Sequence, residues 1–170
     1  MVDDFLNHRV DPDVIRDVGA SLGAWISPRR PSLVLTAEAS GIPGALACAL
    51  HLDLPLVYAK KYVTSGDRRS FVREVASPTK GVEYRVEVSR RVLPPDQRVA
   101  IIDDILAQGR TAEALGEIVE EAGSTVVGLG FAMEKAFMAG RQRLEAHDWE
   151  VHAVVTVTAI DGGAVTLRSA

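Results

Sequence analysis

The chain has 170 residues, of which 47% are hydrophobic and 25% charged, a balance typical of a globular protein with one substantial core. Its net charge of -4 leaves no basic excess to neutralise phosphates, which argues against a general nucleic-acid binder. No apolar stretch is long enough to cross a bilayer, and the start Met1-Val2-Asp3-Asp4 is acidic where a secretory signal is basic, so we expect a cytoplasmic protein with no membrane partner.

Helical and strand patterns alternate along the first sixty residues. Asp11 and Pro12 mark the start of an amphipathic helix, with Asp11 as its N-cap. The elements expected after it are a buried strand over 33–36, a turn of small residues over 37–41, a helix over 42–52 and a strand over 54–59. The last of these strands ends at Lys60 and Lys61.

Residues 62–91 have a different character, because charged and polar residues dominate there. Weak alternation over 70–75 and 84–88 predicts two strands, and so long a polar excursion indicates a hairpin or a mobile flap. Each basic residue of this segment is explained as a solvated charge, but together they could close over a ligand and exclude water. These residues are Arg68, Arg69, Arg73 and Lys80.

The most informative stretch is the next one. Residues 99–102 are typical of a fully buried strand and lead directly to Asp103 and Asp104. A short loop follows, and Thr111 is expected to cap a helix over 112–122. Carboxylates at the end of a strand, beside a loop with free amides at a helix N-terminus, predict a ligand that carries both hydroxyls and a phosphate. The alternatives are a helix cap beside a solvated acid, or a dinucleotide-binding strand.

The rest of the chain continues the alternation of strands and helices. The expected elements are a strand over 125–133 followed by Glu134 and Lys135, a helix over 137–147, a strand over 151–159 and a short tail over 161–170. The pattern predicts an α/β fold with a mostly parallel sheet, helices on both faces and a hairpin flap over about 62–91. We treat residues 1–170 as a single domain whose charged strand ends gather along one edge of the sheet.

Residues 99–111 resemble the phosphoribosyl pyrophosphate signature of type I phosphoribosyltransferases, which consists of a hydrophobic strand, two acids and a small-residue loop. The resemblance implies that Asp103 and Asp104 approach the ribose hydroxyls. It also implies that the loop amides hold the 5-phosphate. The loop residues implied in phosphate binding are Ala107, Gln108, Gly109, Arg110 and Thr111.

Further segments are similar to those of the xanthine-specific branch of this family. They comprise residues 5–12, 36–42, 57–61 and 128–141, so the resemblance covers nearly the whole chain. It implies that Ser40, Lys60 and Lys61 serve the pyrophosphate and that Asn7 and Lys135 serve the base. A lysine ammonium can donate to an oxo group, which xanthine has and adenine lacks. On spacing alone, a helix cap or a turn is the favoured explanation of Asn7, and a lysine after a buried strand is most often a solvated residue at the sheet edge, as Lys135 would be.

The reaction that the resemblance implies is transfer of a phosphoribosyl group to N9 of a purine. Mg²⁺ is expected to bind the substrate, and no side chain of the protein is expected to contact the ion directly. The expected partners are the purine base, phosphoribosyl pyrophosphate and a second copy of the chain in a homodimer. Family members usually carry a further N-terminal segment before the position that matches Val2, and it contributes to the base pocket. Two alternatives stay open: an adenine phosphoribosyltransferase, and a non-catalytic regulator that binds phosphoribosyl pyrophosphate.

Overall fold

A computed structural model describes residue 6 and residues 8–62, 69–76 and 83–169. Within these residues, eight strands form one sheet in the order β3-β4-β2-β1-β5-β6-β7-β8. The strands are β1 (Leu33–Ala37), β2 (Leu56–Tyr62), β3 (Ser70–Ala76), β4 (Glu83–Ser89), β5 (Arg98–Leu106), β6 (Thr125–Lys135), β7 (Val151–Asp161) and β8 (Ala164–Ser169). The helices are α1 (Pro12–Ile26), α2 (Gly41–Leu52), α3 (Arg110–Glu121) and α4 (Gly140–Glu145), with a 3-10 turn over Ser27–Arg29.

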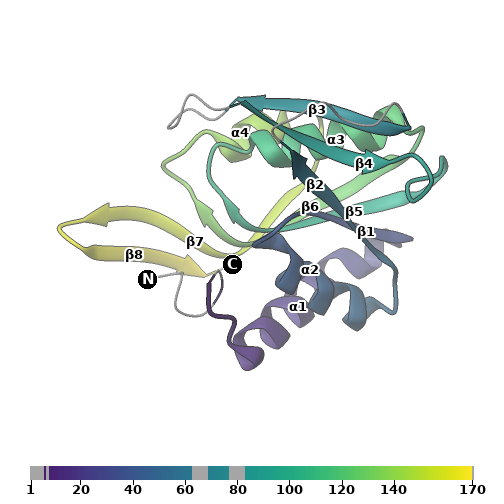
Figure 1. Ribbon diagram of the computed structural model, residues 1–170. Helices are drawn as coiled ribbons and strands as arrows, with labels where there is room; N and C mark the ends of the chain where they lie inside the picture. The colour runs from purple at the N-terminus through teal and green to yellow at the C-terminus, as the bar shows by residue number, and fades with distance from the viewer. Residues whose placement is uncertain (1–5, 7, 63–68, 77–82, 170) are drawn as a thin grey trace.

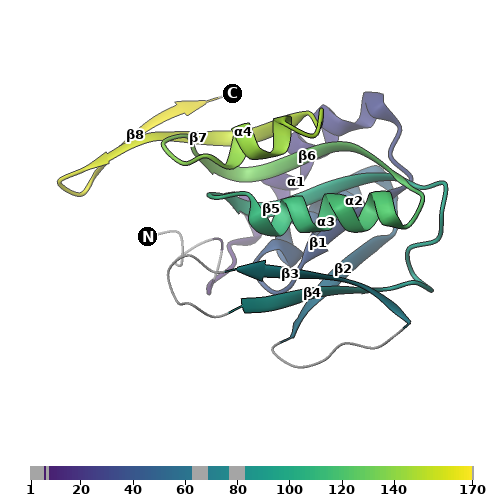
Figure 2. The ribbon, with the colours of Figure 1, turned by 90° about the horizontal axis from the view of Figure 1, so that it is seen from above.

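The five central strands are parallel and are flanked by antiparallel strands on both sides. Helices α1 and α2 cover one face of the sheet, and α3 and α4 cover the other (Figures 1 and 2). This arrangement confirms the predicted α/β class with a mostly parallel sheet between two helical layers. Among the described residues, no helix is long and apolar enough to cross a membrane.

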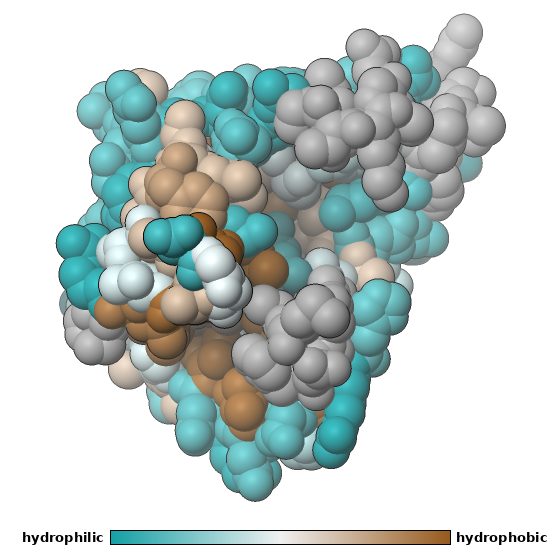
Figure 3. Space-filling view, turned by 90° about the vertical axis from the view of Figure 1, so that its left-hand side faces the viewer, coloured by the Kyte–Doolittle hydropathy of each residue, from teal (hydrophilic) through white to brown (hydrophobic). Residues whose placement is uncertain are grey.

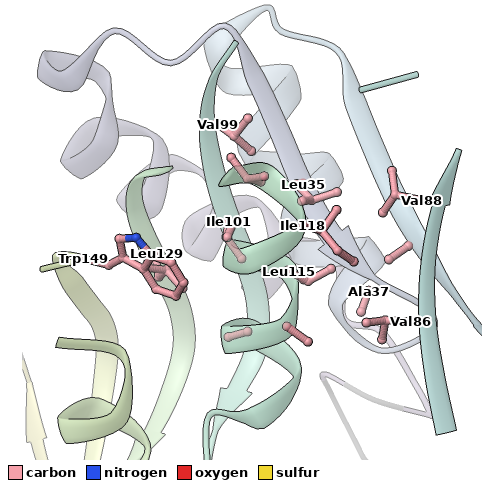
Figure 4. Packing of buried hydrophobic residues seen from close by; sticks show 14 of the residues in the cluster. Leu35, Ala37, Val86, Val88, Val99, Ile101, Leu115, Ile118, Leu129 and Trp149 are labelled. Atoms are coloured by element: carbon pink, nitrogen blue, oxygen red, sulfur yellow. The ribbon is translucent and has the colours of Figure 1, made fainter. Parts of the chain in front are cut away.

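Strand β5 separates two hydrophobic cores, as expected of a strand that is buried on both faces. Ile101 belongs to the core under α3, whereas the next residue, Ile102, belongs to the core under α1 and α2. Figure 4 shows Leu115 and Ile118 of α3 packed over Leu35 in the first of these cores. Packing therefore holds β5 on both sides, and the loop that follows starts from a fixed position.

Asp11 caps α1 as predicted, because its side chain accepts hydrogen bonds from the N–H groups of Asp13 and Val14 at 3.0 and 3.3 Å. The helix expected over 137–147 is much shorter, since α4 spans only Gly140–Glu145 and follows a turn. The predicted C-terminal tail is wrong: β8 pairs antiparallel with β7 across a turn at Gly162 and Gly163. An Asp-Gly-Gly sequence is a strong hairpin signal that the sequence analysis overlooked.

The β7–β8 hairpin extends beyond the body of the molecule (Figures 1 and 2). Ile160, Val165 and Leu167 on this hairpin are more than half exposed. Figure 3 looks at the molecule from the side toward which the hairpin points and shows hydrophobic surface among polar side chains there.

The carboxyl end of β6 is fixed by a buried ion pair. Glu134 is almost completely buried, and Arg141 of α4 donates to its two carboxylate oxygens at 2.8 and 2.6 Å. Arg141 also donates to the Val151 carbonyl oxygen at 2.8 Å, which ties α4 to the start of β7. Because a buried carboxylate is costly without a partner, this pair is expected to hold α4 against the sheet.

We expect Arg141→Leu to lower the free energy of unfolding by about 3 kcal/mol, because it leaves the Glu134 carboxylate buried and unpaired. Urea denaturation of the purified variant measures this loss. The matched control is Arg16→Leu, which removes an exposed ion pair with Asp13 and should cost less than about 0.5 kcal/mol. Equal losses for the two variants would contradict the role of the buried pair.

Candidate functional site

A cavity of about 210 Å³ opens beside the carboxyl end of β5. Its wall combines the end of β5, the following loop and the start of α3 with residues from β2, β3, β4 and β6. The lining consists of residues 103–112 together with Ser40, Lys61, Val75, Tyr84 and Phe131. The structure thus brings together every residue that the sequence analysis assigned to the sugar and the 5-phosphate, along with two of the three assigned to pyrophosphate.

The two acids lie inside β5 and not after it, because the strand continues to Leu106. One Asp103 carboxylate oxygen accepts a hydrogen bond from the Asp104 N–H at 2.9 Å, and one Asp104 oxygen accepts from the Ile105 N–H at 2.8 Å. Each carboxylate is thereby oriented by its own backbone, and both line the cavity. The remaining carboxylate oxygens are well placed to accept hydrogen bonds from the hydroxyls of a ligand.

The pKa of Asp103 is raised from 3.8 to about 7. Burial is the main cause, and the neighbouring Asp104 charge adds to it, since both disfavour the ionised form. The Asp104 N–H and the Lys61 ammonium oppose the rise. With its pKa near 7, this carboxyl group ionises near neutral pH when a cation approaches, because a positive charge favours the ionised form.

The loop after β5 delivers a helix N-terminus to the cavity. α3 begins at Arg110, and its N-cap is Gly109 in the left-handed conformation with φ 73°. The predicted N-cap, Thr111, is wrong, because its hydroxyl bonds instead to the Tyr84 hydroxyl at 2.6 Å. Since glycine has no side chain to cap the helix, the first amides of α3 stay available to an anion.

Lys60 and Lys61 lie within β2, paired with Glu87 and Val86 of β4. Successive side chains of a strand point to opposite faces, so the two lysines separate. Lys61 lines the cavity and lies over the Tyr84 ring, with its Nζ 5.5 Å from the ring centroid. Lys60 borders a different depression on β2 and β4. The sequence analysis placed both at a strand end and therefore did not separate them.

The hairpin expected as a flap is part of the sheet where the structure describes it, because β4 pairs with β2. Arg73 of β3 donates to Glu117 at 2.8 Å and to Glu121 at 2.6 Å, both on α3. These bonds hold the hairpin against α3, the helix that follows the loop after β5. Arg68 and Lys80, also named as flap residues, lie outside the described residues.

Of the two residues assigned to the base, Lys135 lies within the described residues and Asn7 does not. Lys135 is partly buried at the last position of β6, where its carbonyl oxygen accepts from the Met138 N–H at 3.0 Å. It follows Glu134 directly, so the buried ion pair with Arg141 fixes its backbone. It is not part of the cavity lining among the described residues. Asn7 lies outside the described residues.

Several residues of the site had no functional prediction from the sequence. Val75, Tyr84 and Phe131 line the cavity, and Arg143 of α4 donates to the Gln108 carbonyl oxygen at 3.0 Å. In the sequence, Tyr84 is only the first residue of the weak strand pattern over 84–88, and Phe131 is only one residue of the strand pattern over 125–133. No local signal marks Arg143, because its contact spans 35 residues of sequence.

Residues 18–166 match the family model described as Phosphoribosyl transferase domain. The xanthine phosphoribosyltransferase of Chloroflexus aurantiacus is 45% identical over 162 residues, which cover 95% of this chain and 77% of that protein. The xanthine phosphoribosyltransferase of Pseudomonas syringae pv. syringae is 37% identical over 168 residues, which cover 98% of this chain and 89% of that protein.

Solved structures of similar fold carry another base in their names. The adenine phosphoribosyltransferase of Rhodothermus marinus superposes with a TM-score of 0.74 at 30% identity, covering 86% of this chain and 81% of that one. The adenine phosphoribosyltransferase of Thermoanaerobacter pseudethanolicus gives a TM-score of 0.76 at 24% identity, covering 86% and 82%, and supports the fold alone.

The raised pKa of Asp103 predicts how stability depends on pH. A carboxyl group with a folded pKa above its unfolded value favours folding fully below pH 3.8 and loses that contribution as the pH rises through about 7. We therefore expect Asp103→Asn to be more stable than the wild type at pH 8. This advantage should shrink as the pH falls toward 4, as measured by urea denaturation of the ligand-free protein.

A companion variant tests the cause of the shift. Asp104→Asn removes the charge that helps to raise the pKa of Asp103, so the pKa of Asp103 should fall in this variant. Lys61→Met removes an opposing charge and should raise it. NMR titration of the Asp103 carboxyl carbon measures both shifts, and shifts of the same sign in the two variants would contradict the assignment.

Proposed function

Because the chain belongs to the phosphoribosyltransferase family, we propose that it transfers the 5-phosphoribosyl group of phosphoribosyl pyrophosphate to N9 of a purine base. The base we propose is xanthine, and the product is xanthosine monophosphate. The chain is then a purine salvage enzyme, and we propose that it acts in the cytoplasm. Relatives named for xanthine support this choice, at 37–45% identity over nearly the whole chain. One observation carries the reaction: an acid pair and a helix N-terminus share one cavity.

The 5-phosphate binds the loop and the first turn of α3 in this proposal. Amides of Ala107, Gln108, Gly109, Arg110 and Thr111 surround the anion, and the helix dipole adds to the attraction. The Thr111 hydroxyl lies in the same wall, where Tyr84 already holds it in place. Small residues dominate this loop because the phosphate has to approach the backbone closely.

Asp103 and Asp104 accept hydrogen bonds from the ribose hydroxyls. As pyrophosphate leaves C1, the sugar ring gains positive charge, and carboxylates held in fixed positions stabilise that charge. A nucleophilic side chain has no place in this mechanism, since the purine N9 itself attacks C1. The contribution of the protein is positioning and electrostatics.

Lys61 and Ser40 are the residues we propose for the leaving pyrophosphate, because both line the cavity. The Lys61 ammonium offsets the negative charge that develops as the bond to C1 breaks. Lys60 was assigned the same role, but it borders a different depression. We place it at the surface shared with a second subunit, on the proposal that the chain forms a homodimer.

Mg²⁺ fits the chemistry of this cavity. The adjacent Asp103 and Asp104 carboxylates are hard oxygen donors, and the charge of one raises the pKa of the other, a repulsion that a cation relieves. In the described parts of the chain, no group of three His, Cys, Asp or Glu side chains is arranged to hold a metal ion. When bound, Mg²⁺ neutralises charge on the pyrophosphate.

The base lies toward the carboxyl end of β6 in this proposal. Lys135 donates to an oxo group of xanthine, and Asn7 offers a donor and an acceptor to the purine edge. The fixed Glu134–Arg141 pair supports Lys135 from the preceding residue. Adenine is the second candidate base, because the superposed Rhodothermus marinus protein is named for it at 30% identity.

A panel assay tests the function. Xanthine, guanine, hypoxanthine and adenine are each incubated with phosphoribosyl pyrophosphate, Mg²⁺ and the protein, and nucleotide products are quantified. The highest kcat/KM is expected for xanthine. Preference for adenine would support the second candidate, and binding of phosphoribosyl pyrophosphate without any product would identify a regulator and overturn the enzymatic proposal.

Gly109→Val should reduce kcat/KM for phosphoribosyl pyrophosphate about a hundredfold or more, because a β-branched side chain is strained at φ 73° and collides with the Gly140 carbonyl oxygen. Asp104→Asn should cause a loss of similar size by removing one carboxylate from the sugar site. Asp96→Asn is the control, because Asp96 is exposed in a distant turn. Full activity of both site variants would refute the assignment.

Lys135→Ala should raise the KM for xanthine about tenfold and leave the KM for phosphoribosyl pyrophosphate unchanged, because it removes a donor to the oxo groups of the base. Steady-state kinetics with xanthine and with adenine measure the selectivity. An unchanged ratio of kcat/KM between these two bases would exclude Lys135 from base recognition.

A further inference from the structure

Helix α4 contacts the loop between β5 and α3, residues 107–109, on the side away from the cavity. Arg143 Nε donates to the Gln108 carbonyl oxygen at 3.0 Å. The two backbones are also in direct contact, since a Cβ added at Gly140 would lie 2.4 Å from the Ala107 carbonyl oxygen. Within the described residues, Arg143 is not part of the cavity lining, so it contacts the loop from behind.

Arg143 is itself oriented by the helix that follows the loop. Its Nη1 donates to a Glu113 carboxylate oxygen at 2.8 Å, and Glu113 lies in the first turn of α3. The other Glu113 oxygen pairs with His147 Nε2 at 3.2 Å, and His147 stacks on Trp149 with ring centroids 4.3 Å apart. The Arg143 guanidinium therefore connects Gln108, the residue before Gly109, to Glu113 in the first turn of α3.

This contact determines which way one peptide unit faces. In a planar trans peptide, the carbonyl and the following N–H point in opposite directions. When the Gln108 carbonyl points back to Arg143, the Gly109 N–H points away from α4. A peptide that precedes glycine flips at low cost, because glycine accepts either sign of φ. An anchor on the Gln108 carbonyl is therefore what selects one orientation.

We propose that Arg143 is a positioning residue, which holds the Gln108–Gly109 peptide with its N–H directed at the phosphate of phosphoribosyl pyrophosphate. The proposal rests on the function proposed above. Glu113 supports it by fixing the guanidinium from the other end of the loop. The side chains of Arg143 and Glu113 are 34% and 23% exposed, so loss of Arg143 leaves no fully buried charge, in contrast to loss of Arg141. Arg143 is therefore expected to affect the binding of phosphoribosyl pyrophosphate.

Steady-state kinetics of Arg143→Met test the proposal, because methionine keeps an apolar stem and loses every donor. The KM for phosphoribosyl pyrophosphate should rise about tenfold, while the KM for xanthine and the melting temperature change little. Arg143→Lys retains a donor and should recover part of the loss. Glu113→Gln leaves Arg143 in place but weakens its orientation, so a smaller rise is expected.

The matched control is Arg98→Met. Arg98 also donates to backbone carbonyls, those of Arg29 and Arg30 at 3.2 and 3.0 Å, but at the opposite end of β5. Both KM values should stay at wild-type level in this variant. The proposal is overturned if Arg143→Met keeps the wild-type KM for phosphoribosyl pyrophosphate, or if it raises both KM values equally.

Calorimetry with ribose 5-phosphate separates this proposal from the proposed function, because it needs no turnover. A wild type that binds ribose 5-phosphate tightly without making nucleotide contradicts the enzymatic function only. Affinity that is equal in the wild type and Arg143→Met contradicts the positioning role, whether or not the protein is active. About tenfold weaker binding by the variant supports it.

Discussion

The parallel pairing of β5 between β1 and β6 is the constraint on which the rest of the structure depends. Parallel strands place their carboxyl ends at one edge of the sheet, and helices must return the chain on either face. Two buried cores hold β5 on both sides, so the acids at its end have little freedom. The loop that follows inherits this rigidity, which a phosphate site built from backbone amides requires.

Helix α4 connects the two halves of the site. Arg141 binds Glu134 at the end of β6, beside the residue proposed for the base, and Arg143 binds the loop proposed for the 5-phosphate. A six-residue helix has little stability of its own. Its position is therefore supported mainly by the buried Arg141–Glu134 pair and by the close backbone contact at Gly140. One short element in this way supports the residues proposed for the base and those proposed for the 5-phosphate.

The electrostatics of the cavity fit the proposed binding of an anionic substrate by a chain with a net charge of -4. Backbone amides at the start of α3 and the Lys61 ammonium supply local positive potential. Burial keeps the pKa of Asp103 near 7, so the acid pair carries less negative charge than two free carboxylates would. In the proposed site, the attraction for an anion comes from these local groups and not from the overall charge.

The alternation of strands and helices as far as β7, the α/β class, the family and the acid pair with its following loop all followed from the sequence, because each depends on residues that are close together in the chain. Apolar runs reveal buried strands, and a strand, acid pair and small-residue loop form one continuous motif. Only the tertiary structure decided that Lys61 and not Lys60 faces the cavity, since that depends on where β2 pairs with β4. It also brought Tyr84 to Thr111 and Arg143 to Gln108, contacts across 27 and 35 residues that no local pattern encodes. Local sequence determined what the loop is made of, and long-range packing determined which way its groups point.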